Sequence, residues 1–256
     1  MNASDLRGAD GPDDEWTLRY LMLGPGESPP LIVEELCGTD TASAPVVPEL
    51  AWRNALGGQT WRLGDRYLKW SPRAAGIDLG REAERLRWLE GRFPAPHLLG
   101  SGDDGAGQWM ITAALDAGSA ASAVWRARPE QAVRAVAEGL RRLHAVPVAG
   151  VPLHWESWVS RTPQELGARP PVDAPVLVHG DACVPNTLVD AEGRFAAIVD
   201  VGDLAVGDRW ADLAVCAMSL EWNYGTGWDG VFYEAYGVRP DLARIAFYRA
   251  LRDSES

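Results

Sequence analysis

Two short apolar runs near residue 190 constrain the fold more than any other part of the sequence. Thr187–Val189 and Phe195–Val199 flank an Ala-Glu-Gly turn at residues 191–193, so we expect them to pair as an antiparallel β-hairpin. Asn186 immediately precedes the first run and Asp200 immediately follows the second. Because the two open ends of a hairpin lie side by side, the pattern predicts that Asn186 and Asp200 are neighbours.

A third polar residue, Asp181, lies in the loop that leads into this hairpin, within the sequence His-Gly-Asp-Ala-Cys-Val-Pro-Asn of residues 179–186. Phosphoryl transfer needs a carboxylate that orients the attacking hydroxyl or accepts its proton, and it needs oxygen ligands for Mg²⁺. Asp181, Asn186 and Asp200 supply both. Each of them alone is also typical of a turn cap, but the ordered set favours a phosphoryl-transfer site.

The remaining sequence is rich in short strands before residue 114 and rich in helices after it, which indicates an α+β fold. The expected strands are Trp16–Leu23, Pro30–Glu35, Ala51–Leu56, Thr60–Leu63, Tyr67–Trp70, Leu98–Leu99, Gln108–Ala114 and Val176–Val178. The expected helices are Asp78–Phe93, Pro129–Val146, Trp210–Glu221, Trp228–Tyr236 and Pro240–Arg252. We therefore expect a flexible segment at 1–15, an N-terminal lobe at 16–114 built on an antiparallel sheet with one main helix, and a mostly helical C-terminal lobe at 115–256.

The basic residues are almost all arginine: Lys69 is the single lysine among 24. A position that keeps lysine in such a chain favours a need for a compact ammonium group, with chance survival as the alternative. Lys69 ends an expected strand, and Glu82 lies in the first turns of the next expected helix. Nucleotide kinases use this arrangement to direct a lysine at phosphate.

Three segments resemble the aminoglycoside phosphotransferase family, and most closely its 3'-phosphotransferase branch. They are H-G-D-A-C-V-P-N-T-L-V at 179–189, I-V-D-V-G-D-L-A-V-G-D-R-W-A-D-L-A at 198–214 and R-E-A-E-R-L-R-W-L-E-G-R-F-P-A-P at 81–96. The resemblance spans residues 50–253. It implies a protein-kinase-like fold of two lobes, with the nucleotide-binding residues in the first lobe and the catalytic and substrate-binding residues in the second.

The resemblance also implies a role for each matching residue. Asp181 is expected to be the catalytic base, Asn186 and Asp200 to bind magnesium, and Lys69 to hold the ATP phosphates while paired with Glu82. The cofactors implied are ATP and Mg²⁺.

Further residues of the motifs have structural or weaker binding roles. His179 is expected to position the loop, while Asp208 and Asp212 brace it and cap the following helix. Backbone N–H groups at Gly57 and Gly58 are candidates to cover the triphosphate, although a Gly-Gly pair between strands is also an ordinary hairpin turn.

The strand that contains Thr112 and ends at Ala114 resembles the family's interlobe linker, whose backbone holds adenine. The alternative interpretation of this strand is an ordinary edge strand.

Two departures from the family bear on the substrate. Asp203 stands where relatives usually have arginine, and it either repels phosphate or holds a substrate amine. Arg252 lies among the C-terminal acids that commonly contact substrate amines in the family, which weakens the case for a polycationic substrate. The candidate substrate-side acids are Asp203, Glu156, Glu221, Asp229 and Asp253.

The composition excludes several other functions. A formal net charge of −12 opposes binding to nucleic acid or to an anionic membrane, and it suits a cationic small molecule. The apolar runs are too short to span a bilayer, and three widely spaced cysteines lack the spacing of zinc or disulfide sites. We therefore expect a cytoplasmic enzyme that needs no protein partner; the sequence does not determine its oligomeric state.

The function expected is transfer of the γ-phosphate of ATP to a hydroxyl of an aminoglycoside antibiotic, of the 3'-phosphotransferase type, which confers resistance. The first alternative is a kinase of the same fold acting on a macrolide, an amino alcohol or a sugar. An inert nucleotide-binding module would lack the base or a metal ligand. A metal-dependent hydrolase would normally bring further histidine or carboxylate ligands.

Overall fold

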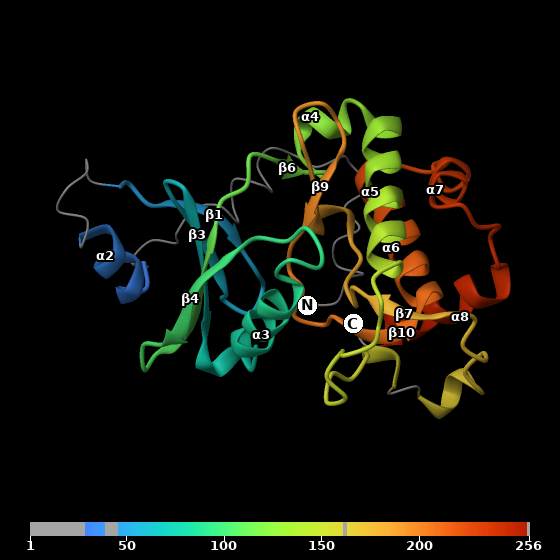
Figure 1. Ribbon diagram of the computed structural model, residues 1–256, viewed down its shortest axis with the longest axis horizontal. Helices are drawn as coiled ribbons and strands as arrows, with labels where there is room; N and C mark the ends of the chain where they lie inside the picture. The colour runs from blue at the N-terminus through green and yellow to red at the C-terminus, as the bar shows by residue number, and fades with distance from the viewer. Residues whose placement is uncertain (1–28, 39–45, 161–162, 255–256) are drawn as a thin grey trace. The chain divides into compact units, whose positions relative to one another are not determined.

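The computed structural model describes residues 29–38, 46–160 and 163–254, which form two compact units (Figure 1). The N-terminal unit comprises the described residues up to Arg87 together with Pro96–Leu115. The C-terminal unit comprises Trp88–Ala95 and the described residues from Asp116 onward. The expected flexible segment 1–15 and the expected strand Trp16–Leu23 lie outside the described residues.

The N-terminal unit is built on a five-stranded antiparallel sheet of order β1-β2-β3-β5-β4. Its elements are α2 (Leu31–Gly38), β1 (Glu49–Arg53), β2 (Gln59–Leu63), β3 (Arg66–Pro72), α3 (Leu79–Leu89), β4 (Leu98–Asp103) and β5 (Gly107–Ala113), with a 3-10 turn η2 at Arg73–Ala75. Apolar residues from β2, β3 and β5 pack with Ile32 and Val33 of α2 to form its core. The expected antiparallel sheet is confirmed.

One expected element of this part is wrong, and one expected helix ends earlier than predicted. Pro30–Glu35 is the beginning of helix α2 and not a strand. A short apolar run is too short for its spacing to distinguish a helix from a strand. In the structure, Ile32, Val33 and Leu36 pack against the sheet at helical spacing. The helix expected to reach Phe93 ends at Leu89. Gly91 adopts a left-handed conformation with φ 70°, and the N–H groups of Arg92 and Phe93 both donate hydrogen bonds to the Leu89 carbonyl, which ends the helix.

The C-terminal unit combines two small sheets with five helices among its described residues. β6 (Gly118–Ser119), β8 (Thr187–Val189) and β9 (Phe195–Ile198) form one sheet, and β7 (Pro175–Val178) pairs with β10 (Ala205–Asp208). The helices are α4 (Ala123–Arg126), α5 (Pro129–His144), α6 (Arg209–Tyr224), α7 (Asp229–Tyr236) and α8 (Leu242–Ser254). The 3-10 turns are η3 (Trp158–Ser160), η4 (Gln164–Leu166) and η5 (Val184–Asn186). The expected mostly helical character is confirmed.

Helix α6 is the centre of this unit. Every residue from Trp210 to Leu220 is buried, which is typical of a helix surrounded by other elements. It packs against α5, α7, α8 and β7, and the α5 and α6 helices are drawn side by side in Figure 1. Its first turn is fixed by Asp208, whose Oδ1 accepts a hydrogen bond from the Trp210 N–H at 3.2 Å, as the sequence predicts for an N-cap.

Residues Trp88–Ala95, the end of α3 and the segment after it, belong to the C-terminal unit, whereas the sequence places them in the expected lobe at 16–114. The Trp88 ring packs edge-on against Trp155, with 5.7 Å between their centroids, and the Phe93 ring packs against Phe195 at 5.8 Å. The Pro94 carbonyl accepts a hydrogen bond from the Ile198 N–H of β9. This segment therefore supports the hairpin of β8 and β9 from outside.

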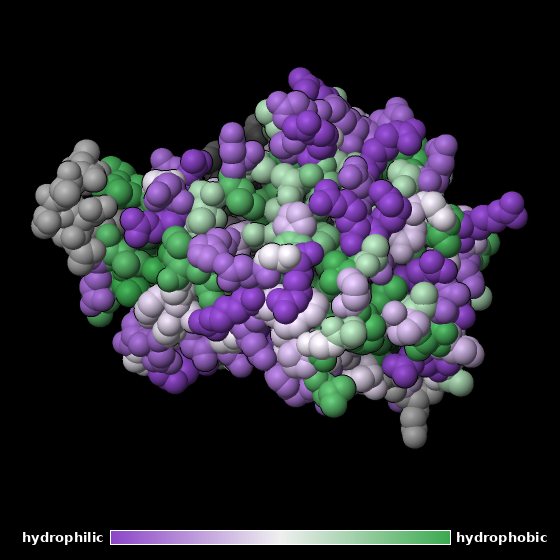
Figure 2. Space-filling view, in the orientation of Figure 1, coloured by the Kyte–Doolittle hydropathy of each residue, from purple (hydrophilic) through white to green (hydrophobic). Residues whose placement is uncertain are grey.

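On the face shown in Figure 2, the described hydrophobic residues lie interspersed with hydrophilic ones. Within the described ranges, no helix is both long and apolar enough to cross a membrane.

Candidate active site

The hairpin brings Asn186 and Asp200 to neighbouring positions, as the sequence predicts. β8 and β9 pair with Thr187 opposite Ile198, and the Val199 N–H donates to the Asn186 carbonyl at 2.9 Å. Asp200 follows directly, with φ 58°, and among the described residues it is the one non-glycine with positive φ. Aspartate tolerates this left-handed conformation better than most residues, and such strain clusters at functional sites.

The loop before the hairpin holds the Asp181 side chain. The Asn186 amide Nδ2 donates to the Asp181 carbonyl oxygen at 2.9 Å and to its carboxylate Oδ2 at 3.1 Å. This fixes the orientation of the amide, because both contacts are made by its nitrogen. The Asn186 Oδ1 therefore points away from Asp181, and it accepts no hydrogen bond from the described residues. Asn186 thus orients one carboxylate and presents one oxygen ligand.

Cys183 is held in the same loop, in surroundings that disfavour its thiolate form. Burial and the neighbouring negative charge of Asp181 raise the pKa of the Cys183 thiol, so that it stays protonated at neutral pH. Its Sγ donates a hydrogen bond to Asp181 Oδ1 at 3.2 Å.

His179 ties the loop to the end of the hairpin. Its ring Nε2 contacts the Val199 carbonyl at 3.0 Å, and its Nδ1 accepts a hydrogen bond from the Asp181 N–H at 3.3 Å. One neutral tautomer, with the proton on Nε2, satisfies both contacts. The ring therefore fixes the backbone before Asp200 relative to that of Asp181, which is the positioning role expected from the sequence.

A buried carboxylate anchors this loop on helix α6. Asp212 accepts hydrogen bonds from the His179 N–H at 2.6 Å and from the Gly180 N–H at 3.0 Å, and its Oδ2 also contacts His144 Nε2 at 3.0 Å. Burial raises the pKa of a carboxyl group, but the contacts with His144 and His179 outweigh it, and the pKa of Asp212 lies below its ordinary value. The expected bracing role of Asp212 is confirmed.

His144 is a partner that the sequence analysis missed. It lies near the end of α5, and its Nδ1 contacts the Tyr236 hydroxyl of α7 at 2.7 Å. The available signal was a histidine on the apolar face of an amphipathic helix, four residues after Leu140.

The N-terminal unit contains the expected lysine–glutamate pair. Lys69 lies in β3 between Thr60 of β2 and Met110 of β5, and its Nζ contacts Glu82 Oε2 at 2.7 Å. Glu82 is buried in the first turn of α3. The pair holds the ammonium group at a fixed place on the sheet.

The Gly-Gly turn uses its own N–H groups internally. The Gly57 N–H donates to the Asn54 carbonyl at 3.1 Å, and the Gly58 N–H donates to Asn54 Oδ1 at 2.8 Å. Gly57 has a φ of 85°, which favours glycine, and a Cβ at Gly58 would lie 2.5 Å from Asn54 Nδ2, so the Asn54 side chain would have to shift. For these N–H groups to contact a phosphate, their hydrogen bonds to Asn54 would first have to break.

Thr112 and Ala114 lie at and just beyond the end of β5. Thr112 is buried and pairs with Tyr67 and Leu98, while the Ala114 N–H donates to the Asp65 carbonyl at 2.8 Å. The N-terminal unit ends at Leu115, so these residues directly precede the passage of the chain into the C-terminal unit.

The substrate-side acids of the C-terminal unit differ in their surroundings. Glu221 accepts a hydrogen bond from Arg249 of α8 at 3.0 Å. The pKa of the Asp229 carboxyl group is raised, mainly because the group is partly buried. The negative charge of Glu221 adds to this rise, and the positive charge of Arg249 opposes it. Asp203 and Asp253 are exposed. Asp203 lies directly against Gly180, because a Cβ added at Gly180 would lie 2.6 Å from the Asp203 Cβ.

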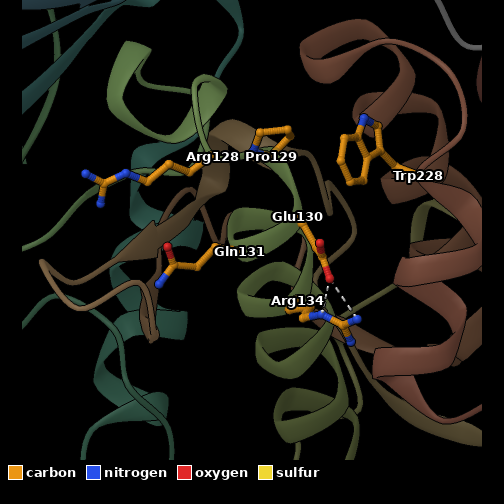
Figure 3. Close-up of a pocket in the computed structure, with 6 residues that line it drawn as sticks. All are labelled: Arg128, Pro129, Glu130, Gln131, Arg134 and Trp228. Carbon is orange, nitrogen blue, oxygen red and sulfur yellow. Dashed lines mark hydrogen bonds and ion pairs between the residues drawn. The ribbon is translucent and has the colours of Figure 1, made fainter.

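A separate cavity of about 480 Å³ lies at the start of α5 (Figure 3). It is lined by Arg128, Pro129, Glu130, Gln131, Arg134 and Trp228. Glu130 and Arg134 form an ion pair along one turn of α5, and none of the predicted site residues lines this cavity.

Comparisons with known proteins agree with the motifs. The sequence profile of the phosphotransferase enzyme family matches residues 56–169 and 158–248. An aminoglycoside 3'-phosphotransferase from Streptomyces fradiae is 33% identical, in a match that covers 72% of this chain and 84% of that protein.

Solved structures show the same fold. The crystal structure of an aminoglycoside 3'-phosphotransferase of type VIII superposes with a TM-score of 0.68 at 24% identity and covers 86% of this chain and 97% of its own. A Streptomyces rimosus aminoglycoside phosphotransferase, solved with ADP and streptomycin, gives a TM-score of 0.63 at 22% identity and covers 87% of this chain and 97% of its own. The expected protein-kinase-like fold is confirmed, and the chain belongs to the aminoglycoside phosphotransferase family of phosphotransferase enzymes.

Proposed function

We propose that this protein transfers the γ-phosphate of ATP to a hydroxyl of an aminoglycoside, as a 3'-phosphotransferase, with Asp181 as the residue that accepts the hydroxyl proton. The observation that carries the proposal is the arrangement of Asp181, Asn186 and Asp200 on one loop and hairpin. The relatives named above, one of them solved with ADP and streptomycin, support binding of a nucleotide and an aminoglycoside.

Asp181 suits the role of base because its carboxylate is oriented before a substrate arrives. Asn186 holds Oδ2, and the loop is braced by His179 and Asp212. A carboxylate offers about four lone-pair positions. Asp181 accepts three hydrogen bonds, from Cys183 and Arg252 at Oδ1 and from Asn186 at Oδ2, which leaves room at Oδ2 for a substrate hydroxyl. Asp181 then receives the proton as the new oxygen–phosphorus bond forms and the bond to the leaving ADP breaks.

The Asn186 Oδ1 and the Asp200 carboxylate fit a magnesium ion that arrives with a nucleotide. Mg²⁺ prefers oxygen ligands and usually takes only one or two side chains from the protein, with phosphate oxygens and water completing its shell. Among the described residues, no group of three or more histidine, cysteine, aspartate or glutamate side chains is placed to hold a metal by itself. When bound, Mg²⁺ neutralises charge on the phosphates. This inventory favours a nucleotide-dependent transferase over a metal-dependent hydrolase.

Lys69, held by Glu82, is proposed to contact the nucleotide phosphates. Because Lys69 is the one lysine of the sequence, an amine-acylating reagent is expected to modify only Lys69 and the terminal amine, to inactivate the enzyme, and to be slowed by saturating Mg-ATP. Peptide mass spectrometry locates the modification. Loss of one charge-assisted contact in Lys69→Met is expected to raise the KM for ATP roughly ten- to hundredfold.

The matched control for this experiment is Lys69→Met itself, which retains the terminal amine but not the lysine. The reagent should leave the residual activity of this variant unchanged. Modification of Lys69 in the wild type without any change in the KM for ATP would contradict the assigned role.

A coupled assay of ADP release tests the proposed function directly. With Mg-ATP and a panel of aminoglycosides, macrolides, small amino alcohols and simple sugars, we expect turnover on aminoglycosides that carry a 3'-hydroxyl. Turnover on a macrolide, an amino alcohol or a sugar alone would instead support a same-fold kinase with a different substrate.

A further inference from the structure

The side chain of Arg252 contacts the proposed base. Arg252 lies in the last turn of α8, and its Nη2 donates to Asp181 Oδ1 at 2.8 Å. The guanidinium carbon also lies 5.7 Å from the centroid of the Trp158 ring, a cation–π distance. About 30% of each side chain is exposed, at 30% for Arg252 and 29% for Asp181, so the pair is open to an incoming molecule.

This contact places a fixed positive charge beside the reacting group of the substrate. The hydroxyl that loses its proton must approach a carboxylate oxygen of Asp181 to within hydrogen-bonding distance. Asn186 occupies Oδ2, and Cys183 and Arg252 occupy Oδ1. A hydroxyl that binds at Oδ2 is therefore next to the Arg252–Asp181 contact, and a substituent on the adjacent carbon that faces Oδ1 comes close to the guanidinium group.

The other arginine on this side of α8 also compensates an acid. Arg249 stands three residues before Arg252 and pairs with Glu221 at 3.0 Å. Two carboxylates of the C-terminal unit that would attract a substrate ammonium, Asp181 and Glu221, are thus each matched by an arginine of α8. The substrate side of this unit is therefore less anionic than the net charge of −12 suggests.

From this geometry we infer that Arg252 is a specificity-determining residue: it disfavours substrates with an ammonium group on the carbon next to the reacting hydroxyl and favours those with a neutral or anionic group there. The inference rests on the proposed function and names the substrate subclass within it. The physical basis is repulsion between two like charges at close range in a partly solvated site.

A matched pair of antibiotics tests the inference. Kanamycin A has a hydroxyl at carbon 2', next to the 3'-hydroxyl, and kanamycin B has an amine there. At mildly acidic pH, where that amine is protonated, the wild type is expected to show a kcat/KM about tenfold higher for kanamycin A, mainly through KM. Added salt should reduce this ratio, because the site is partly exposed.

Substitutions then assign the preference to Arg252. Arg252→Gln and Arg252→Met, the latter keeping an apolar chain over Trp158, are expected to bring the ratio close to one, while Arg252→Lys is expected to restore most of it. Arg239→Gln removes the same charge from an exposed position of the same unit and should leave the ratio as in the wild type. Thermal melts are used to check that each variant is folded.

The outcomes separate the inference from the proposed function. If both antibiotics are phosphorylated and the ratio is the same in the wild type, Arg252→Gln and Arg252→Met, the inference is overturned and the proposed function stands. If neither antibiotic is phosphorylated by any variant, nor bound in calorimetric titration with a non-hydrolysable ATP analogue, the proposed function is overturned, and the inference with it.

Discussion

Replacing Asp181 with asparagine is expected to lower kcat about 10²- to 10⁴-fold, the range typical of a lost general base. The amide of asparagine is nearly the same size as the carboxylate but does not accept a proton at neutral pH. The affinity for nucleotide should change little, because Lys69, Asn186 and Asp200 remain in place. The ADP-release assay gives kcat, and a titration with a fluorescent nucleotide gives the dissociation constant.

Glu192→Gln is the matched control for Asp181→Asn. Glu192 lies exposed in the turn of the same hairpin, where its carboxylate contacts Arg194. Activity of this variant should equal that of the wild type. Full activity in Asp181→Asn, or loss of nucleotide binding together with activity, would contradict the role of Asp181 as base.

Replacing Asp212 with asparagine is expected to destabilise the C-terminal unit by about 3 kcal/mol. The Asp212 carboxylate is buried and accepts hydrogen bonds from two backbone N–H groups, at His179 and Gly180, and also contacts His144. An amide has one oxygen to offer in place of two, so at least one buried donor is left without a partner. For a chain of this size, the midpoint of thermal unfolding should fall by roughly 10 °C.

The pH dependence of this loss has a definite sign. Because the pKa of Asp212 in the folded protein is below its ordinary value of 3.8, the stability that the carboxylate contributes is fully present above that value. It is lost as the pH falls through the lower, folded-state pKa. The difference between wild type and Asp212→Asn should therefore be largest near neutral pH and should shrink in strong acid.

Urea denaturation at two pH values measures both the loss of folding stability in Asp212→Asn and the dependence of that loss on pH. The control is Glu138→Gln, which weakens an exposed ion pair with Arg142 on α5 and should change the free energy of unfolding by less than about 1 kcal/mol. A change in Asp212→Asn as small as that of the control would show that Asp212 does not anchor the loop.

The hairpin and its loop could be predicted from the sequence because their constraints are local. A turn at 191–193 between two apolar runs fixes the pairing of β8 with β9, and this pairing alone brings Asn186 next to the residue before Asp200. The same holds for Lys69 and Glu82, which are 13 residues apart on β3 and α3, with the short 3-10 turn η2 between these elements. Such contacts follow from the chain path of one strand and one helix.

Contacts between distant segments could not be predicted in this way. Arg252 and Asp181 are 71 residues apart, and His144 and Asp212 are 68 apart, so their meeting depends on how α5, α6 and α8 pack. The sequence does not distinguish helix α2 from a strand, because its short apolar run fits both the helical and the strand spacing. Only packing against the sheet decides between the two. The sequence pattern thus predicts which residues of the loop and the hairpin lie together, but not the arginine that contacts Asp181.

The most direct test of the account is to identify the product formed from ATP labelled at its γ-phosphate. Purified enzyme is incubated with magnesium and either kanamycin A or its 3'-deoxy analogue, and the antibiotic is analysed by mass spectrometry and phosphorus NMR. The account predicts one labelled phosphate ester on the 3'-oxygen of kanamycin A and no product from the 3'-deoxy analogue. Equal labelling of both compounds would contradict the 3'-assignment, and labelled inorganic phosphate without any phosphorylated antibiotic would contradict the proposed transfer itself.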